Sequence, residues 1–290
     1  MDNIDKFVQL VQESDNIVFF GGAGVSTESG IPDFRSQDGL YNQKYDYPPE
    51  TILSHTFFMR HPDEFYRFYQ DKMLCDTAKP NAAHLKLAEL EASGKLKAVI
   101  TQNIDNLHQM AGSKKVLELH GSVYRNYCMK CGKSYDFAYM KNAKGVPKCT
   151  CGGMIKPDVV LYEEGLDNGV ISEAVRAISQ AQVLIIGGTS LAVYPAAGLI
   201  DYFSGEHLVV INKSPTPRDR YADLLIKEPI GQVFSQIQVK KVETINGNLT
   251  KPLAGAYFKV YETMKDAQDQ QNEICQIGPT KANGTAGEEK

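Results

Sequence analysis

A glycine-rich segment near the N-terminus has the composition of a phosphate-binding loop. Residues 21–35, Gly-Gly-Ala-Gly-Val-Ser-Thr-Glu-Ser-Gly-Ile-Pro-Asp-Phe-Arg, directly follow the apolar run 17–20. We expect this run to be a buried parallel strand and the loop to open a helix. Glycine lets the backbone approach a pyrophosphate closely, and the first N–H groups of a helix point at an anion. The segment therefore predicts an anion site, although such turns also serve plain helix–sheet packing.

Two pairs of cysteines have the spacing of a zinc site. Cys128 and Cys131 are separated by two residues, Cys149 and Cys151 by one, and seventeen residues lie between the pairs. Thiolate pairs on tight glycine-bearing turns suit tetrahedral zinc, and four sulfurs leave no position open for water. We therefore predict one structural zinc ion per chain. The two remaining cysteines lie outside this pattern.

His120 is the candidate for acid–base chemistry. It ends the apolar run 116–119 and is followed by a glycine. A histidine in such a place is more often structural. However, a parallel sheet binds its ligands at the carboxyl ends of its strands, which favours a catalytic role. We expect His108 to support the fold or a ribose pocket, and the other four histidines to be structural.

Polar and small residues follow other apolar runs at the same edge of the expected sheet. The run 98–100 is followed by Gln102, Asn103, Ile104 and Asp105. The run 183–186 is followed by Gly188, Thr189 and Ser190. The first group could hold ribose hydroxyls and a carboxamide, and the second suits phosphates. Asn212 ends the run 208–211, where NAD dehydrogenases often carry an acid for the adenosine ribose. Asp33 and Asp105 could instead cap turns, which is an ordinary role for aspartate.

Short apolar runs alternate with helical patterns along most of the chain. The expected strands cover residues 17–20, 98–100, 116–119, 183–186, 208–211 and 224–226. We expect helices capped by Asn3 and Asn81, and others over 64–74, 170–179, 195–203 and 231–237. This alternation predicts a parallel sheet covered on both faces, a Rossmann-like doubly wound α/β domain. Two stretches interrupt it, and the polar segment 266–290 buries too little apolar surface to be ordered.

Composition excludes several classes of protein. The chain has 290 residues, of which 42% are apolar, which is enough for a large core. Its formal net charge of −4 gives no overall bias toward nucleic acid. No apolar run approaches the about 20 residues of a membrane helix, and the N-terminus lacks a secretion signal. We therefore expect a cytoplasmic protein with reduced cysteines. Residues 121–157 carry seven cations against one anion, which indicates a solvated lobe or, as the minority alternative, a surface for acidic partners or nucleic acid.

Six motifs, in order, resemble the signature of one family. They are the loop 21–35, Thr-Gln-Asn-Ile-Asp-Asn-Leu-His at 101–108, Leu-His-Gly at 119–121, the four cysteines, Gly-Gly-Thr-Ser at 187–190 and Val-Val-Ile-Asn at 209–212. The set resembles the sirtuins (the Sir2 family, here of bacterial type), which consume NAD to remove acyl groups from lysine. The resemblance extends over residues 5–240, most of the chain.

The resemblance implies two domains and an extension. Residues 1–35, 81–120 and 157–245 would form the Rossmann-like NAD-binding domain. Residues 36–80 and 121–156, the two interrupting stretches, would form a small domain from a helical module and a zinc module. Residues 246–290 would be a C-terminal extension, largely disordered after about residue 265. Both substrates would bind in the cleft between the domains.

The implied activity is that of an NAD-dependent protein-lysine deacetylase (deacylase). The acyl oxygen attacks the ribose carbon that bears nicotinamide, which leaves, and His120 as general base removes a proton from the ribose diol. The 2′ oxygen then attacks the acyl carbon, and water releases lysine and an O-acyl-ADP-ribose. NAD is thus a consumed co-substrate, the partners are acylated-lysine proteins or peptides, and a monomer is favoured.

The resemblance also assigns the other site residues. The NAD contacts are Gly22, Ala23, Gly24, Thr27, Asp33, Phe34, Arg35, Gln102, Asn103, Ile104, Asp105, Gly188, Thr189, Ser190 and Asn212. Gln102 faces the reacting ribose, Ile104 and Asp105 form the nicotinamide pocket, Phe34 shields it and Arg35 contacts the cofactor. The substrate peptide adds as a strand to Val159, Val160, Leu161 and Tyr162. Tyr-Glu-Glu stands at 162–164 where Phe-Gly-Glu is common, so we expect peptide binding to differ in detail.

The small-domain helix bears on the choice of acyl group. Sirtuins that prefer succinyl- or malonyl-lysine share a Tyr-x-x-Arg pair there, whereas here Arg67 directly follows Tyr66. Neighbours on a helix point about 100° apart and cannot converge on one carboxylate. Tyr69 and Lys72 have the right spacing, but an ammonium lacks the guanidinium fork. We therefore expect a preference for uncharged acyl groups.

Two alternative functions are open. ADP-ribosyl transfer or NAD hydrolysis would use the same activated ribose, and product analysis separates them from deacylation. A non-catalytic NAD-sensing or nucleic-acid-binding module is the alternative from another class, and the His-Gly pair and the intact 102–105 string argue against it. A dehydrogenase is disfavoured because the first loop lacks a full Gly-x-Gly-x-x-Gly.

Overall fold

A computed structural model of the chain describes residues 2–35, 39–40 and 46–239, and the backbone of three short strands beyond them. Met1–Lys240 form one compact unit and Lys241–Lys290 a second. The residues of the candidate site all belong to the first unit. Among the described residues, no helix is both long enough and apolar enough to cross a membrane.

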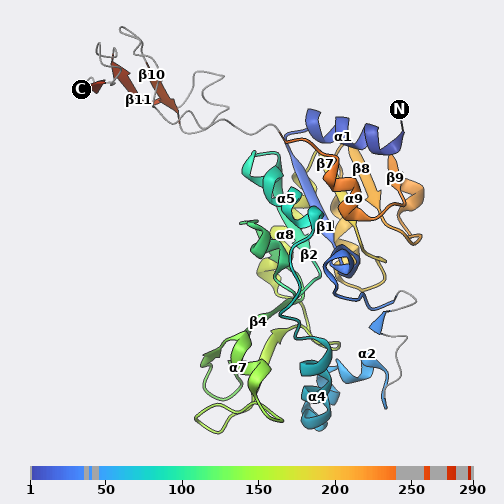
Figure 1. The fold of residues 1–290 in the computed structure, drawn as a ribbon, viewed down its shortest axis with the longest axis vertical. Coiled ribbons are helices and arrows are strands. Elements are labelled where there is room, and N and C mark those ends of the chain that lie inside the picture. The colour runs from blue at the N-terminus through green and yellow to red at the C-terminus, as the bar shows by residue number, and fades with distance from the viewer. Residues whose placement is uncertain are drawn as a thin grey trace. The chain divides into compact units, whose positions relative to one another are not determined.

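A six-stranded sheet lies at the centre of the first unit (Figure 1). Its strands are β1 (Ile17–Gly21), β2 (Leu96–Thr101), β3 (Val116–Glu118), β7 (Val183–Gly187), β8 (His207–Ile211) and β9 (Leu224–Ile226). They lie in the order β3-β2-β1-β7-β8-β9, and every neighbouring pair is parallel. The strand order therefore reverses between β1 and β7, and doubly wound sheets bind their ligands at the carboxyl ends of strands at such a point. The predicted Rossmann-like fold is confirmed.

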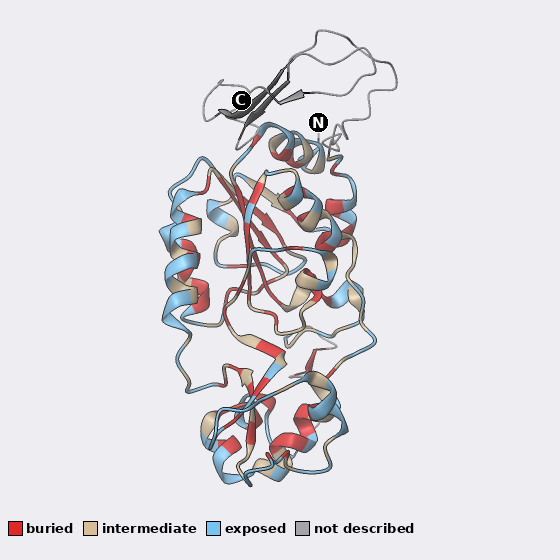
Figure 2. Cartoon of the chain, turned by 90° about the vertical axis from the view of Figure 1, so that its left-hand side faces the viewer, coloured by how far each residue is buried: buried red, intermediate tan, exposed pale blue. Residues whose placement is uncertain are grey.

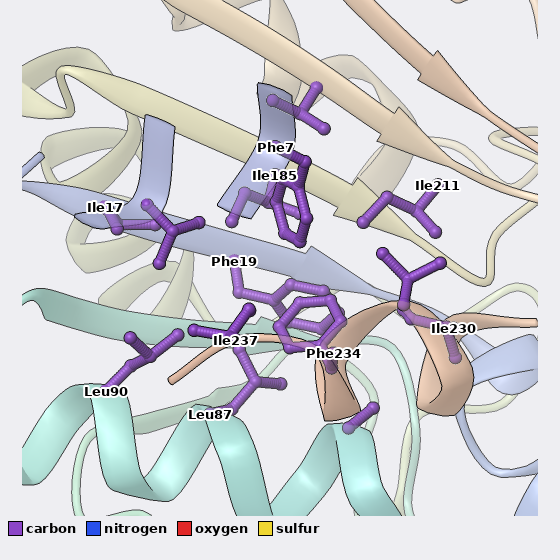
Figure 3. Packing of buried hydrophobic residues seen from close by; sticks show 14 of the residues in the cluster. Phe7, Ile17, Phe19, Leu87, Leu90, Ile185, Ile211, Ile230, Phe234 and Ile237 are labelled. Carbon is purple, nitrogen blue, oxygen red and sulfur yellow. The ribbon is translucent and has the colours of Figure 1, made fainter. Parts of the chain in front are cut away.

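Helices cover both faces of this sheet, so β1 and β7 are buried along their whole length. Successive side chains of a strand point to opposite faces. Phe19 accordingly packs in one core with α1 (Asn3–Glu13), α5 (Ala82–Ala92) and α9 (Ile230–Ser235), and its ring lies 5.8 Å from that of Phe234 (Figure 3). Val18 and Phe20 pack in the other core with α8 (Asn168–Gln180) and the 3-10 helix η4 (Ala196–Tyr202). In Figure 2 the buried colour follows these strands.

Several element ends differ from the sequence-based expectation. Asp2, not Asn3, caps α1, because its carboxylate accepts the Asp5 N–H at 2.8 Å while Asp5 reciprocates. Asn81 caps α5 as predicted. The loop after β1 forms two 3-10 turns, η1 (Ala23–Val25) and η2 (Thr27–Ser29), instead of the expected helix. Glycine and β-branched residues in this loop are poor helix formers.

A second, antiparallel sheet carries the cysteines. Its strands β4 (Gly121–Cys128), β5 (Ser134–Tyr135) and β6 (Ile155–Val159) lie in the order β5-β4-β6, and α7 (Phe137–Asn142) contacts β4. The preceding helices are α2 (Pro49–Ile52), α3 (His55–Arg60) and α4 (Pro62–Lys72). Phe58 and Phe65 of these helices share one buried cluster with Met140 and Ile155. The two stretches that interrupt the doubly wound pattern therefore share a core of their own.

Beyond residue 239 the structure describes only β10 (Phe258–Tyr261), β11 (Glu273–Gly278) and β12 (Gly287–Glu288), an antiparallel sheet in that order. The polar composition did not predict these strands. The other residues of the extension lie outside the described residues, and its disorder after about residue 265 stays a prediction.

Candidate active site

Two glycine loops meet at the carboxyl ends of β1 and β7. The N–H of Gly22 donates to the Gly187 carbonyl at 3.2 Å, and that of Gly24 donates to the Gly188 carbonyl at 2.8 Å. A Cβ atom at Gly24 would lie 2.9 Å from the Gly188 Cα, and Gly188 has a φ of 57°. Only glycine permits this backbone approach. The structure thus brings together the two loops that the sequence assigned to phosphates, at the switch point of the sheet.

Gln102 joins these loops to the candidate base. Its side-chain amide donates to the Thr189 hydroxyl at 3.0 Å, and its own N–H donates to the Gly21 carbonyl at 3.0 Å. Its main-chain carbonyl lies 3.0 Å from Nδ1 of His120. Gln102 follows directly after β2, so the carboxyl ends of β1, β2, β3 and β7 contribute to one group of contacts.

His120 is held in one tautomer. A carbonyl oxygen only accepts hydrogen bonds, so Nδ1 of His120 donates to Gln102 and the lone pair remains on Nε2. Burial lowers the pKa of His120, and the contact with the Gln102 carbonyl opposes this in part. The imidazole is therefore neutral at neutral pH, with Nε2 available to take a proton.

Ser26 ties the first loop to the polar residues after β2. Its buried hydroxyl donates to a carboxylate oxygen of Asp105 at 2.6 Å and accepts from the Asn103 amide at 3.0 Å. The other oxygen of Asp105 accepts the Leu107 N–H at 3.0 Å. Burial raises the pKa of Asp105, while these hydrogen bonds lower it. Asp105 thus caps a turn and also belongs to the site, and Ser26 is a site residue that the sequence analysis did not single out.

The rest of the first loop has a more local arrangement. Asp33 accepts the Arg35 N–H at 3.1 Å, which is the turn-capping role considered for it. Phe34 and Ile104 pack against the same buried cluster as the small sheet. Thr27 donates its hydroxyl to the Gly24 carbonyl at 3.0 Å. Two further assigned residues, Ala23 and Ser190, lie within the glycine loops. Asn212 follows β8, and its side-chain amide donates to the Ser214 carbonyl at 2.7 Å.

The expected peptide-binding segment, residues 159–162, continues from β6 past the candidate base. The Val160 N–H donates to the His120 carbonyl at 3.0 Å. Further on, the Tyr162 N–H donates to the Leu53 carbonyl at 3.0 Å, and the Tyr162 carbonyl accepts the His55 N–H at 2.9 Å. Main-chain hydrogen bonds therefore fix this segment at two places, one of them on His120 itself.

The four cysteines form a compact donor set. Their Sγ atoms lie within 4.8 Å of one another, and Cys128–Cys151 and Cys131–Cys149 are 3.5 Å apart. Zinc–sulfur bonds of about 2.3 Å in a tetrahedron require sulfurs about 3.8 Å apart, so the set fits zinc. The main chain at Cys151 lowers the pKa of Cys149 to about 5, whereas the neighbouring thiols raise the pKa of Cys131. A thiolate is the form that binds the metal.

The cysteine turns have the shape that such a site needs. Gly132 and Gly152 adopt φ values of 72° and 82°, and the Lys130 N–H points at the Cys128 sulfur at 3.4 Å. Cys128 and Cys149 are themselves buried in the cluster of the small sheet. Four thiolates saturate tetrahedral zinc, so the metal has a structural role and supplies no open position for chemistry.

Acidic partners neutralise part of the basic stretch 121–157. Three of its seven cations are paired with carboxylates from outside it. The pairs are Arg125 with Glu118 and Asp158, Lys156 with Glu164, and Lys141 with Asp76. This favours the solvated lobe over a surface for nucleic acid.

His84, which was expected to be structural, and His108, which was expected to support the fold or a ribose pocket, form a buried pair. The rings of His84 and His108 lie 4.7 Å apart, and burial lowers the pKa of both, that of His84 to about 4. Nδ1 of His84 accepts the Asn81 N–H at 3.2 Å, and the Asn81 amide donates to the Val25 carbonyl at 2.8 Å and to Ser29. His84 thus acts through packing and helix capping, and His108 packs against it in the buried interior.

Two glycine loops at the switch point of a doubly wound sheet, beside a buried neutral histidine, are typical of an α/β enzyme that acts on a nucleotide. Residues 22–195 match the Sir2 family. The chain belongs to the Sir2 family.

Known relatives and structures agree with this assignment. An NAD-dependent protein deacetylase of Clostridium acetobutylicum is 60% identical over 241 residues, which are 82% of this chain and 98% of the relative. A Sir2 structure with a p53 peptide and NAD+ is 43% identical, with a TM-score of 0.71 over 81% of this chain and 96% of the other. A Sir2 variant with deacetylated p53 peptide and 3′-O-acetyl ADP-ribose is also 43% identical, with a TM-score of 0.74 over 80% and 95%.

Proposed function

We infer that this chain is an NAD-dependent protein-lysine deacetylase, which transfers the acyl group to ADP-ribose and releases nicotinamide. Deacetylases of the same family support this activity, at up to 60% identity over nearly their whole length. The observation that carries it is the position of His120, whose free Nε2 lies in the group of contacts that joins both glycine loops.

His120 serves as the general base. Its Nδ1 keeps its proton, which it donates to the Gln102 carbonyl, so Nε2 takes a proton from a hydroxyl of the NAD ribose. Loss of this proton makes the ribose oxygen a nucleophile for the acyl carbon. The lowered pKa keeps the imidazole in the form that can accept a proton.

The loops and the polar residues hold NAD as the co-substrate. The N–H groups and close-packed glycines at 22–24 and 188–190 would take the phosphates. The Ser26 contacts fix the side chains of Asn103 and Asp105, which would hold the nicotinamide end, with Phe34 and Ile104 as its apolar wall. Asn212 would contact the adenosine ribose.

Residues 159–162 would receive the acylated peptide as an added strand. The Val160–His120 hydrogen bond supports this placement because it sets the segment directly beside the base. The cysteine site lies in the same antiparallel sheet and holds that sheet's shape, without a part in the reaction. A cytoplasmic location and a monomeric state stay predictions from the sequence.

Mass spectrometry of the products tests this function. NAD and an acetyl-lysine peptide, incubated with the chain, should yield nicotinamide, free-lysine peptide and O-acetyl-ADP-ribose in equal amounts. Nicotinamide release with the acetyl group left on the peptide would instead identify an NAD hydrolase or an ADP-ribosyltransferase. A parallel incubation without peptide measures that background.

A further inference from the structure

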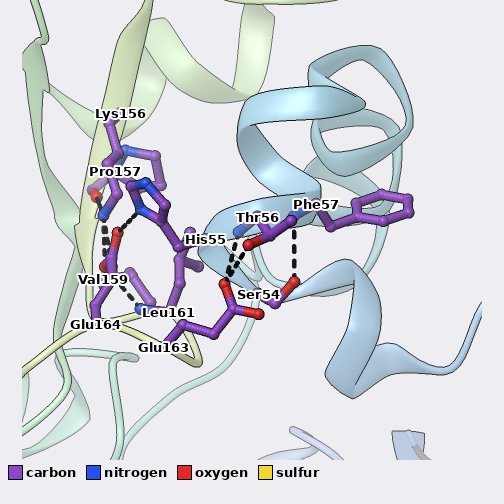
Figure 4. Close-up of polar contacts among 10 residues, drawn as sticks. All are labelled: Ser54, His55, Thr56, Phe57, Lys156, Pro157, Val159, Leu161, Glu163 and Glu164. Atoms are coloured by element: carbon purple, nitrogen blue, oxygen red, sulfur yellow. Dashed lines mark hydrogen bonds and ion pairs between the residues drawn. The ribbon is translucent and has the colours of Figure 1, made fainter.

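Two carboxylates follow the proposed peptide-binding segment and reach back to α3 and β6 (Figure 4). Glu163 adopts a φ of 75°, in the left-handed region that favours glycine. Such a backbone persists where surrounding contacts over-determine it. The contacts of Glu163 and Glu164 therefore have to hold this turn.

Glu163 caps the N-terminus of α3. One of its carboxylate oxygens accepts the Thr56 N–H at 2.9 Å and the Thr56 hydroxyl at 2.7 Å. Ser54 caps the same end by accepting the Phe57 N–H at 3.2 Å. The contact between Glu163 and Thr56 thus joins residues 107 positions apart in the sequence.

Glu164 closes the turn on the segment itself. One carboxylate oxygen lies 2.8 Å from Nδ1 of His55, and the other accepts the Leu161 N–H at 2.9 Å and the Lys156 ammonium at 3.0 Å. Because Lys156 lies in β6 and His55 in α3, Glu164 connects both elements to the main chain of the segment. These contacts hold the turn that ends the segment.

We propose that Glu163 and Glu164 form a carboxylate latch that holds residues 159–162 in the conformation that receives the acylated peptide. The proposal rests on the proposed function. A strand held in its binding conformation loses less conformational entropy when a peptide pairs with it. The latch residues are positioning residues: they set the affinity for the peptide and leave the chemistry at His120 unchanged.

Thr56→Val and Glu163→Gly test the latch. Thr56→Val removes the hydroxyl donor at nearly constant volume, and Glu163→Gly removes the carboxylate while glycine accepts the positive φ freely. Each variant should raise the KM for an acetyl-lysine peptide roughly three- to ten-fold, as expected for a lost hydrogen bond to a charged group near the surface. The KM for NAD and kcat at saturating peptide should stay within about twofold of wild type.

Controls separate the latch from a general loss of structure. Thr51→Val, at another exposed threonine in the neighbouring helix α2, should leave the peptide KM unchanged. Glu163→Gln, whose amide oxygen can still accept from Thr56, should lie between wild type and Glu163→Gly. The double variant Thr56→Val/Glu163→Gly should be no worse than the more affected single variant, because Thr56→Val removes one of the two contacts that Glu163→Gly already removes. Melting temperatures close to wild type would confirm that every variant is folded.

The outcomes of this experiment distinguish the two proposals. Normal wild-type turnover with a peptide KM unchanged in both single variants would overturn the latch alone. An improved peptide KM in Glu163→Gly would also overturn it, because relief of backbone strain would then outweigh the lost contact. Absence of acetyl-peptide turnover by the wild-type chain would overturn the proposed function, and the latch with it.

Discussion

His120 takes its reactive form from a main-chain group, and its pH dependence should reveal this. Burial lowers the pKa of His120, and only the neutral imidazole can accept a proton. Because protonation inactivates the base, kcat should fall as the pH drops, with an acid limb below the value of about 6.5 for a free histidine. A pH–rate profile at saturating NAD and peptide measures this limb. An acid limb above pH 7 would contradict the buried, neutral base.

Removal of the imidazole should separate the steps of the reaction. His120→Ala should lower deacetylation by roughly the 10²–10⁴-fold typical of a positioned general base. Exchange of labelled nicotinamide into NAD should be less affected, since nicotinamide leaves before the base acts. His207→Ala, a substitution at the start of β8, serves as the control and should retain wild-type rates. Product formation close to normal in His120→Ala would exclude His120 as the base.

The sequence predicted which residues lie at the candidate site better than it predicted the hydrogen bonds between them. The ends of apolar strands indicated His120, Gln102 and Thr189, because parallel strands place their carboxyl ends at one edge. The sequence did not indicate that Ser26 bridges Asn103 and Asp105, which lie more than 70 positions away. Such a contact depends on how the loops pack, and a serine in a glycine-rich loop carries no signal of its partners.

The helix α4 bears on the acyl groups that the enzyme accepts. Tyr66 is fully buried and donates its hydroxyl to the Ile155 carbonyl, whereas Arg67 is 74% exposed and pairs with Asp46. The two side chains therefore diverge, as their spacing predicted, and Tyr69 is buried as well. We expect kcat/KM to be higher for acetyl and butyryl peptides than for the matched succinyl peptide. A succinyl value equal to or above the acetyl value would contradict this prediction.

The His84–His108 pair between α5 and α6 (Leu107–Ala111) should make the fold sensitive to acid. The folded state holds the pKa of His84 at about 4, against about 6.5 in an unfolded chain. Below pH 6.5 the unfolded chain therefore binds a proton that the folded chain does not, and stability falls as the pH drops toward 4. His84 alone should cost about 2 kcal/mol between pH 7 and 5, and His108 adds to this loss.

Urea unfolding at pH 7 and pH 5 measures this effect. His84→Gln should show a smaller loss of unfolding free energy between the two pH values than wild type does. His207→Gln, at the half-buried start of β8, is the control and should match wild type. Equal pH dependence in wild type and His84→Gln would show that the buried pair does not govern acid stability.

The sequence predicted the positions of the central strands more accurately than the kind of helix in the loop after β1. Apolar runs located β1 and β7 to within one residue, since a buried strand has to be continuously apolar. The 3-10 turns after β1 were not predicted, because a strand followed by small residues and a helix has a similar local pattern. The cap of α1 was displaced by one residue because Asp2 and Asn3 are both good caps, and backbone angles decide between them.

At the scale of the whole molecule, we expect stability to depend on the zinc site through the core of the small sheet. Cys128 and Cys149 are buried among the aromatic residues of α3 and α4, so loss of the metal removes support from that cluster. Cys128→Ser should give metal-poor protein with a lower melting temperature, whereas Cys75→Ser should keep its zinc. Elemental analysis and thermal melts measure both quantities. Active wild-type protein without zinc would contradict a structural metal.

The doubly wound topology was predictable from sequence because strand–helix alternation leaves few ways to cover a parallel sheet. The cysteine spacing likewise predicted a donor set that the structure brings together. The latch was not predictable, because the contact between Glu163 and Thr56 needs two segments that only the folded chain places side by side. Long-range contacts of single polar side chains leave no periodic trace along a sequence.

The hydrogen bond from His120 to the carbonyl of Gln102 has a consequence for mutational scanning. Every amino acid carries the same main-chain carbonyl, so no substitution at position 102 deletes the acceptor that selects the tautomer of His120. A scan of position 102 would report the loss of the side-chain amide, which donates to Thr189 and is expected to face the ribose of NAD. The contact that fixes the tautomer of the proposed base therefore depends on the position of the main chain after β2, and a substitution at position 102 leaves the acceptor in place.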